Sequence, residues 1–143
     1  MAARNVTFQS DTFDCHKSEV TRIMAPHTFD TVDYGTYRVV AVRGDVDLGN
    51  AAELATVMAL AGESTPVIVD LSGCSYLDST GLSVFVRHER LRRGRTAIVA
   101  PPNHRSLHLL EITGLALTLN VLPSLDAATT FCETRSHGIA KAV

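Results

Sequence analysis

The sequence has few cysteines, and they lie far apart. Cys15, Cys74 and Cys132 are the only three in 143 residues. An odd number at wide spacing does not suit a disulfide framework, so we expect reduced thiols. A redox role for Cys74 stays open, because this residue lies in the loop expected just before the motif described below.

Long apolar runs and an excess of charge of one sign are also missing. No stretch is long enough to cross a bilayer, and the first ten residues lack the apolar core of a signal peptide. The net charge is -2 and the isoelectric point is about 6.3. This balance gives no reason to expect nucleic acid or an anionic membrane as a partner. We expect a soluble cytoplasmic protein that binds another protein or a small ligand.

The motifs of the common enzyme classes are absent as well. The chain has no Walker A loop, no Gly-x-Gly-x-x-Gly and no Gly-x-Ser-x-Gly. His104 and His108 have a spacing that can bind zinc on a helix, but no Cys-x-x-Cys supplies further ligands. We therefore expect no metal, no cofactor and no enzyme. A small hydrolase that uses Ser79 or Thr80 is kept as the alternative from another functional class.

Apolar residues make up 45% of the chain, which is enough for the core of one domain. Strands are expected at 37–43, 67–71, 96–100 and 117–122, and helices at 50–61, 78–94, 103–113 and 124–135. Residues 44–47 are expected to be a tight link to a further short strand. The run 67–71 is continuously apolar, which is typical of a strand covered on both faces. The alternation implies a mainly parallel sheet with right-handed crossovers.

The two ends of the chain differ from this central region. Residues 1–33 show no sustained period, although 6–9 and 19–24 suit extended structure. The Asp- and Thr-rich run 30–33 is expected to be a loop. We therefore divide the chain into an N-terminal extension over 1–33 with room for one strand, a domain over 34–135, and a loose tail over 136–143.

One segment carries the chemistry, and it lies where the strand 67–71 leads into the next helix. Asp78 and Ser79 are both good caps for the unpaired N–H groups of that helix, and Gly81 lets a backbone or a partner approach closely. Thr80 falls in the first turn, at the positive end of the helix dipole. A phosphate on Thr80 would meet free N–H groups and would also repel the Asp78 carboxylate. Thr80 thus suits a reversible switch, and the simpler interpretation is that the hydroxyls only cap the helix.

The helix that follows is apolar around most of its circumference. At 100° per residue, the apolar side chains of Leu82, Val84, Phe85, Val86 and Leu91 leave only a narrow polar stripe. Ser83, Arg87 and Arg90 lie in this stripe, and Thr80 lies on the same side, one turn before Ser83. The stripe ends in a cluster of five arginines, Arg87, Arg90, Arg92, Arg93 and Arg95. This cluster is either a solvated helix end or a contact for an acidic patch of a partner.

The segment Asp78-Ser79-Thr80-Gly81-Leu82 resembles the signature of the STAS family, named for sulfate transporters and anti-sigma factor antagonists. Two other elements agree in order and spacing. Residues 42–48 resemble the family's Gly-Glu-Leu-Asp turn, with Asp47 as its last acid, and residues 101–115 resemble its later strand-helix-glycine element. The resemblance covers about residues 36–135. It implies an α/β fold with a mixed, mainly parallel sheet and about four helices packed on one face.

The resemblance also implies a function. Anti-sigma factor antagonists bind an anti-sigma factor, often one with a histidine-kinase-like ATPase fold, and so free the sigma factor. The anti-sigma factor can phosphorylate the antagonist and end the complex, and a phosphatase restores it. In that family the hydroxyl residue before the glycine is the acceptor, which falls on Thr80, with Ser79 as the alternative. Thr80 stands where the family more often has serine.

The partner-binding surface implied by the resemblance and by the polar stripe comprises Asp47, Asp78, Ser79, Thr80, Ser83 and Arg87. The alternative function within the same family is a scaffold, or a module that senses a nucleotide or a lipid, without any phosphorylation switch. In either case the chain itself would carry no catalytic machinery.

Overall fold

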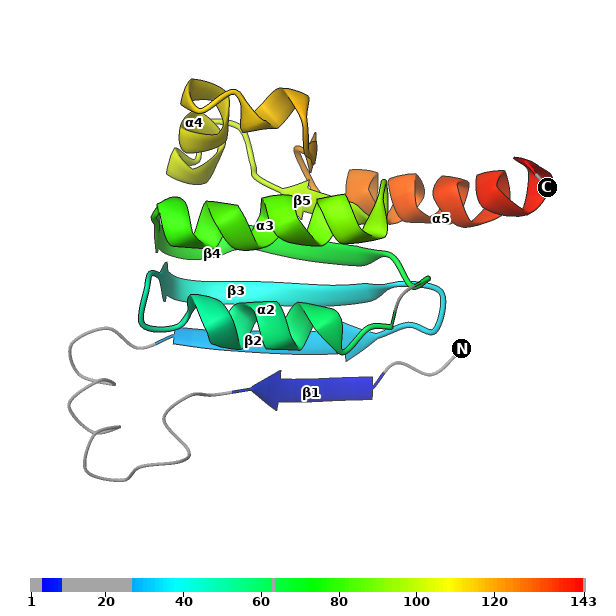
Figure 1. Cartoon of the computed structure of the whole chain (residues 1–143), viewed down its shortest axis with the longest axis horizontal. Helices are drawn as coiled ribbons and strands as arrows, with labels where there is room; N and C mark the ends of the chain where they lie inside the picture. Colours follow the sequence, from blue (N-terminus) through cyan, green and yellow to red (C-terminus); the bar gives the residue numbers. More distant parts are fainter. Residues whose placement is uncertain (1–3, 9–26, 63, 143) are drawn as a thin grey trace.

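The computed structural model describes residues 4–8, 27–62 and 64–142, with side chains over 27–62 and 64–134. Its six strands form one sheet in chain order (Figure 1). They are β1 (Arg4–Phe8), β2 (His27–Asp33), β3 (Arg38–Val46), β4 (Val67–Leu77), β5 (Thr96–Val99) and β6 (Asn120–Leu122). The helices are α2 (Ala51–Ala59), α3 (Ser79–Arg92), α4 (Arg105–Ile112), the 3-10 helix η2 (Leu115–Leu117) and α5 (Leu125–Ala142).

The sheet is mixed, and its parallel part supports the site. β1, β2 and β3 pair antiparallel, whereas β3, β4, β5 and β6 pair parallel. β3 and β4 stay paired from Arg38 opposite Val67 to Val46 opposite Leu77, through two register shifts. Because parallel strands end on the same edge, the turns that follow Val46 and Leu77 emerge side by side. The predicted mixed, mainly parallel α/β fold is confirmed.

The core has two layers because the central strands are apolar on both faces. Val69 of β4 packs on one face, in the cluster that also holds Leu54 of α2 and Phe85 of α3. Ile68 points to the other face, where Ala128 and Cys132 of α5 pack. Helices α2 and α3 cover the near face in Figure 1. The four predicted helices are present, but the prediction that all pack on one face is wrong, since α5 lies on the opposite face.

The N-terminal part contributes more to the sheet than the sequence suggested. The prediction of a loop at 30–33 is wrong, because these residues complete β2 and each of them pairs with a residue of β3. Phe29 of β2 is fully buried in the core. The carboxylates of the supposed loop contact arginines of β3, with Asp30 3.3 Å from Arg43 and Asp33 3.2 Å from Arg38. Strand β1 corresponds to the piece expected at 6–9, and 19–24 lies outside the described residues.

Four other boundaries differ from those predicted. β3 continues through Gly44, where φ is 83°, so residues 44–46 belong to the strand and are no separate link. β4 continues beyond residue 71 to Leu77 and replaces most of the expected loop. η2 occupies the start of the strand predicted at 117–122, so that β6 has only three residues. Helix α5 runs to Ala142, so the residues expected to form a loose tail are helical as far as 142.

Within the described residues, no helix is both long enough and apolar enough to span a bilayer.

Candidate functional site

The site lies where β3 and β4 end, at the N-terminus of α3. The backbone N–H of Asp78 donates to the Val46 carbonyl at 3.2 Å, which joins the turn after β4 to the end of β3. The turn after β3 runs through Asp47 to Asn50 and leads into α2. Two segments that lie about 30 residues apart in the chain thus meet at one edge of the sheet, where their side chains share a surface.

Asp78 is the N-cap of α3, as the sequence predicted. Its Oδ1 accepts hydrogen bonds from the N–H groups of Thr80 at 2.9 Å and Gly81 at 3.2 Å, and from the Thr80 hydroxyl at 2.5 Å. The Thr80 hydroxyl is the largest cause of a lowered pKa of Asp78, and backbone N–H groups, that of Leu48 included, act in the same direction against partial burial. The N–H groups of residues 80 and 81 are therefore occupied, and the expectation that they are free for a phosphate is wrong.

The turn after β3 is built around Asp47 and Asn50. Asp47 Oδ1 accepts from the Gly49 N–H at 2.9 Å, and Asn50 Oδ1 accepts from the Asp47 N–H at 3.0 Å. The Asn50 amide also donates to the Asp45 carbonyl at 2.9 Å. Asp47 is half-buried and its carboxylate holds its own turn, while the neighbouring Leu48 is 79% exposed. The exposed leucine beside the site was not predicted. The sequence feature that could have indicated it is an apolar residue between two turn-forming residues, Asp47 and Gly49.

The two hydroxyl residues of the motif differ in exposure. Ser79 is exposed at the first position of α3, whereas Thr80 is half-buried and its hydroxyl is engaged by Asp78. Ser83 is exposed one turn later and its hydroxyl donates to the Ser79 carbonyl at 2.9 Å. Arg87 is exposed a further turn along the helix. The predicted polar stripe is therefore present, and neither motif hydroxyl belongs to the fully buried core.

Gly81 has a different role from the one expected. A Cβ at this position would lie 2.5 Å from Leu77 Cδ1 and 2.8 Å from Val46 Cγ1. The close approach that the glycine permits is therefore between α3 and the ends of its own strands. Gly81 fixes how far Asp78, Ser79 and the rest of the helix start stand from the sheet.

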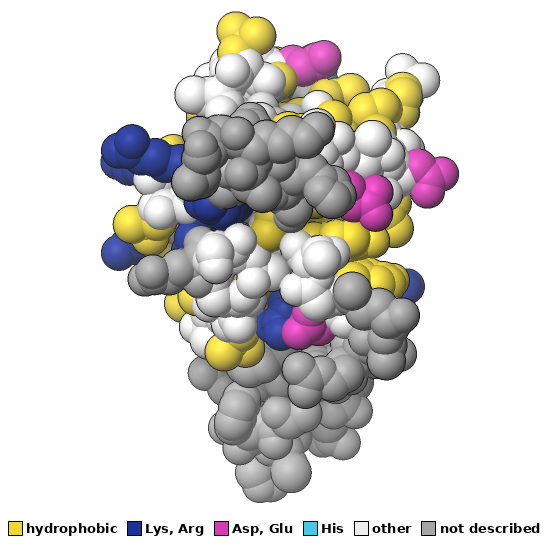
Figure 2. All heavy atoms as spheres, turned by 90° about the vertical axis from the view of Figure 1, so that its right-hand side faces the viewer, with side chains coloured by type: hydrophobic (Ala, Val, Ile, Leu, Met, Phe, Trp, Pro, Cys, Tyr) yellow, Lys and Arg dark blue, Asp and Glu magenta, His cyan; other side chains and the backbone are white. Residues whose placement is uncertain are grey.

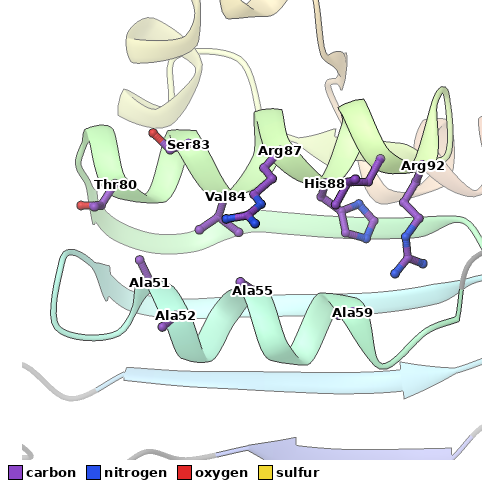
Figure 3. A pocket seen from close by; sticks show the side chains of 11 residues that line it. Ala51, Ala52, Ala55, Ala59, Thr80, Ser83, Val84, Arg87, His88 and Arg92 are labelled. Atoms are coloured by element: carbon purple, nitrogen blue, oxygen red, sulfur yellow. The ribbon is translucent and has the colours of Figure 1, made fainter.

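A groove of about 440 Å³ runs between α2 and α3 beside this site. Figure 3 shows Thr80 near one end of the groove and Arg92 near the other, with Arg87 directed toward α2 between them. Ala52, Ala55 and Ala59 form the α2 side. Thr80, Ser83 and Arg87 of the predicted surface thus line one side of this groove. The contribution of α2 to its other side was not predicted.

His88 is the main residue of α3 that sequence reasoning missed. It is 7% exposed, and its Nδ1 lies 2.6 Å from the Thr96 hydroxyl oxygen of β5. Burial first, and then the charge of nearby Arg92, lower the pKa of His88 to about 4, although the Met58 carbonyl opposes the shift. Leu91 was expected on the apolar side of the helix but is 71% exposed. The apolar arc is therefore narrower than predicted and includes a neutral histidine.

The arginines gather where α3 ends. Arg90 and Arg92 lie in its last turn, and the Arg92 guanidinium donates to the Gly62 carbonyl. Figure 2 views the molecule from the end where α3 and α5 finish. Most basic side chains on that face lie toward one side, and most acidic ones lie on the other.

The remaining candidate residues have structural contacts. His104 is the N-cap of α4, and its Nδ1 accepts from the Ser106 N–H at 3.1 Å, while His108 is exposed. No group of three side chains suited to a metal ion occurs in the part of the chain that the structure describes. Cys74 is 3% exposed, and burial raises the pKa of its thiol, which favours the unreactive protonated form.

The comparison with known proteins covers most of this architecture. The model of the family described as STAS domain matches residues 15–128. The chain belongs to the STAS domain family. No curated protein matches it. The matched range includes β2 and ends within α5.

Two solved structures resemble this STAS domain. The crystal structure of an anti-sigma factor antagonist from Mycobacterium paratuberculosis is 29% identical, covers 72% of this chain and 91% of its own, and has a TM-score of 0.64. The anti-sigma factor antagonist SpoIIAA in its unphosphorylated form is 18% identical, with 66% and 86% covered and a TM-score of 0.49. The first of these shows that the STAS domain described here has a fold like that of an anti-sigma factor antagonist.

Proposed function

We propose that this STAS domain is an anti-sigma factor antagonist that binds an anti-sigma factor, releases the sigma factor, and is switched off by phosphorylation at the start of α3. The observation that carries the proposal is the pair of hydroxyls of Ser79 and Thr80 at a helix N-terminus beside the exposed Leu48. Membership of the STAS family and the likeness to a solved antagonist support it.

The proposed contact surface combines direct and supporting residues. Ser79, Ser83 and Arg87 are exposed along one side of α3, so they are placed to touch a partner. Leu48 adds an apolar anchor from the neighbouring turn. The half-buried Asp47 and Asp78 act mainly by holding the two turns. Thr80 lies between the exposed residues that would touch the partner and the aspartates that hold the turns.

Phosphorylation would change this surface through charge. A phosphate carries about -1.5 to -2 charges at pH 7. Asp78 already holds the N–H groups of Thr80 and Gly81 through a carboxylate whose pKa is lowered. A phosphate at the same helix start would therefore compete with Asp78 for these donors and repel it. A partner that fits the unphosphorylated turn, with the Asp78 carboxylate alone, would then face two adjacent anionic groups.

The geometry favours Ser79 over Thr80 as the acceptor, which reverses the order expected from the family resemblance. The Ser79 side chain is exposed, whereas Thr80 is half-buried and its hydroxyl donates to Asp78 Oδ1. A kinase must reach the hydroxyl oxygen and receive its proton, so the exposed serine needs less rearrangement. We therefore propose Ser79 as the first acceptor and Thr80 as the second.

The test uses anti-sigma factors encoded in the same genome, purified singly and incubated with the STAS domain and ATP. Mass spectrometry identifies the modified hydroxyl in the wild type, Ser79→Ala and Thr80→Ala. Binding is then measured for Ser79→Glu and Thr80→Glu, with Thr130→Glu as the control because Thr130 is an exposed hydroxyl on the opposite face. We expect one glutamate variant at the start of α3 to lose binding while Thr130→Glu binds normally.

Three results would count against parts of this proposal. Wild-type affinity in both Ser79→Glu and Thr80→Glu would refute the switch. Binding without transfer of phosphate to either hydroxyl would identify a scaffold without a phosphorylation switch. The absence of binding to any of the anti-sigma factors would refute the antagonist function itself.

A further inference from the structure

The groove between α2 and α3 has two chemically different walls. The α2 wall consists of the exposed alanines Ala52, Ala55 and Ala59, whose short side chains leave the cavity of about 440 Å³. They lie on one helix face, because their spacings of three and four residues match the helical repeat. A wall of this kind can accept bulkier apolar side chains from another molecule without moving its own backbone.

The α3 wall supplies the charge. Arg87 and Arg92 line the groove, and no carboxylate occurs among its described lining residues. Figure 3 shows both arginine side chains directed from α3 toward α2. Arg92 is held there by its hydrogen bond to the Gly62 carbonyl. An occupant with carboxylates opposite these two positions would therefore meet complementary charge, and a basic occupant would be repelled.

A buried histidine lines the groove. His88 is more than nine-tenths buried, and its Nε2 makes no hydrogen bond of ordinary geometry with the residues that the structure describes. The Met58 carbonyl is close enough to act as an acceptor for the imidazole, and it opposes the lowering of the His88 pKa. Buried polar groups are rarely left unpaired in stable proteins. Because Nε2 itself is inaccessible, an occupant of the groove would pair with it only after the His88 side chain moves.

We propose that the groove receives an acidic amphipathic helix of the anti-sigma factor, a proposal that rests on the function proposed above. An amphipathic helix lies in a groove between two helices through apolar side chains spaced by three or four residues. Ala52 and Ala59 are seven residues apart, so the apolar wall is about 10 Å long and matches two turns of such a helix. Carboxylates at the border of its apolar face would reach Arg87 and Arg92.

This geometry gives the phosphorylation switch a physical cause. Thr80 and Ser83 line the end of the groove next to the helix start. A phosphate on Ser79 or Thr80 would place negative charge at that end. It would repel an acidic helix in the groove, in addition to disturbing the contact of the partner with the start of α3. The same modification would attract a basic occupant and would affect an uncharged one less.

The probes are two synthetic 18-residue peptides with identical leucine-rich faces, one flanked by glutamates and the other by lysines. Binding to the complete STAS domain is followed by amide NMR shifts of α2 and by fluorescence anisotropy. We expect the acidic peptide to bind in the groove, at least about tenfold tighter than the basic one. Arg87→Glu and Ala55→Glu should each weaken it about tenfold or more. Arg90→Glu, the same charge change on another side of α3, should change its affinity less than about twofold.

Equal binding of the two peptides, or equal weakening by Arg87→Glu and Arg90→Glu, would overturn the proposal. The same three variants are then tested against the anti-sigma factor. If Ser79→Glu or Thr80→Glu abolishes that complex and Ala55→Glu and Arg87→Glu do not, the groove proposal fails while the proposed function stands. If the groove variants lose the complex and the helix-start variants keep it, the switch fails while the groove proposal stands. Unfolding curves of each variant confirm that the fold is retained.

Discussion

The hydroxyl of Thr80 donates a hydrogen bond to the same Asp78 oxygen that caps the helix. One carboxylate oxygen thus holds the backbone and a side chain of the first turn of α3. Any change at this position therefore alters the stability of the helix start as well as the surface it presents. Experiments on the switch must separate these two effects, and unfolding curves of Asp78→Ala and Ser79→Ala do so.

Replacing Asp78 by alanine is expected to destabilise the STAS domain by about 1 kcal/mol, because the helix loses its N-cap. Urea unfolding measures this difference. Ser79→Ala is the matched control, and its free energy of unfolding should change by less than about 0.5 kcal/mol because its side chain is exposed. If Asp78→Ala leaves the free energy of unfolding unchanged, the cap contributes nothing to stability. Losses of binding in variants of this turn could then not be ascribed to fraying of the helix.

Gly81→Ala is expected to destabilise the protein by about 1–3 kcal/mol, although alanine is the better helix former. The new Cβ would lie within 2.8 Å of atoms of Leu77 and Val46, so helix and strand ends must separate. Thermal and urea unfolding test this, with Ser83→Ala on the exposed side of the same helix as the control. A stabilised Gly81→Ala protein would mean that α3 does not approach the strands so closely.

Acidification is expected to destabilise the STAS domain through His88. The pKa of this residue is lowered from 6.5 to about 4 in the folded protein, so the unfolded chain binds more protons between these two values. The stability contribution is therefore complete above pH 6.5 and is lost progressively as the pH falls toward 4. The loss is of the order of 3 kcal/mol, and urea unfolding at a series of pH values measures it.

The variant His88→Gln should flatten this part of the pH profile, whereas His108→Gln, which changes an exposed histidine of α4, should leave it unchanged. Titration of the imidazole by NMR provides an independent measurement in the folded protein. An ordinary histidine pKa for His88 in that titration would contradict its burial against Thr96.

Cys74 is expected to resist alkylation and oxidation in the native state. Its thiol is buried and burial raises its pKa, so little thiolate is present and reagents cannot reach it. The variant that carries Cys15→Ser and Cys132→Ser isolates this cysteine, and its reaction with Ellman's reagent is timed with and without denaturant. Rapid native labelling would revive the redox role that the sequence left open.

The parts of the fold that could be predicted are those with strong local signals. The apolar run 67–71 indicated a central strand, and Asp78 and Ser124 indicated helix starts that the structure bears out. The same run also implied cover on both faces, which α5 supplies. These features depend on neighbouring residues in the chain, so a single sequence is enough to show them.

The parts that were missed depend on partners far away in the sequence. β2 carries aspartates that resemble a loop until Arg38 and Arg43 of β3 are placed opposite them. Residues 72–77 are polar enough to resemble a loop as well, yet they remain extended because β3 runs alongside them. The alanines of α2 could not be recognised as a binding wall from the sequence. They border a groove only because α3 packs beside α2.

The position of α5 bears on how this protein can be handled in the laboratory. Because α5 packs on the face of the sheet opposite α2 and α3, a fluorophore or surface tether joined after its last turn would point away from Leu48, Ser79 and the groove. Immobilisation through that end should leave the whole interaction face accessible to soluble anti-sigma factors and peptides. A tether attached to the exposed alanines of α2 would obstruct the same face.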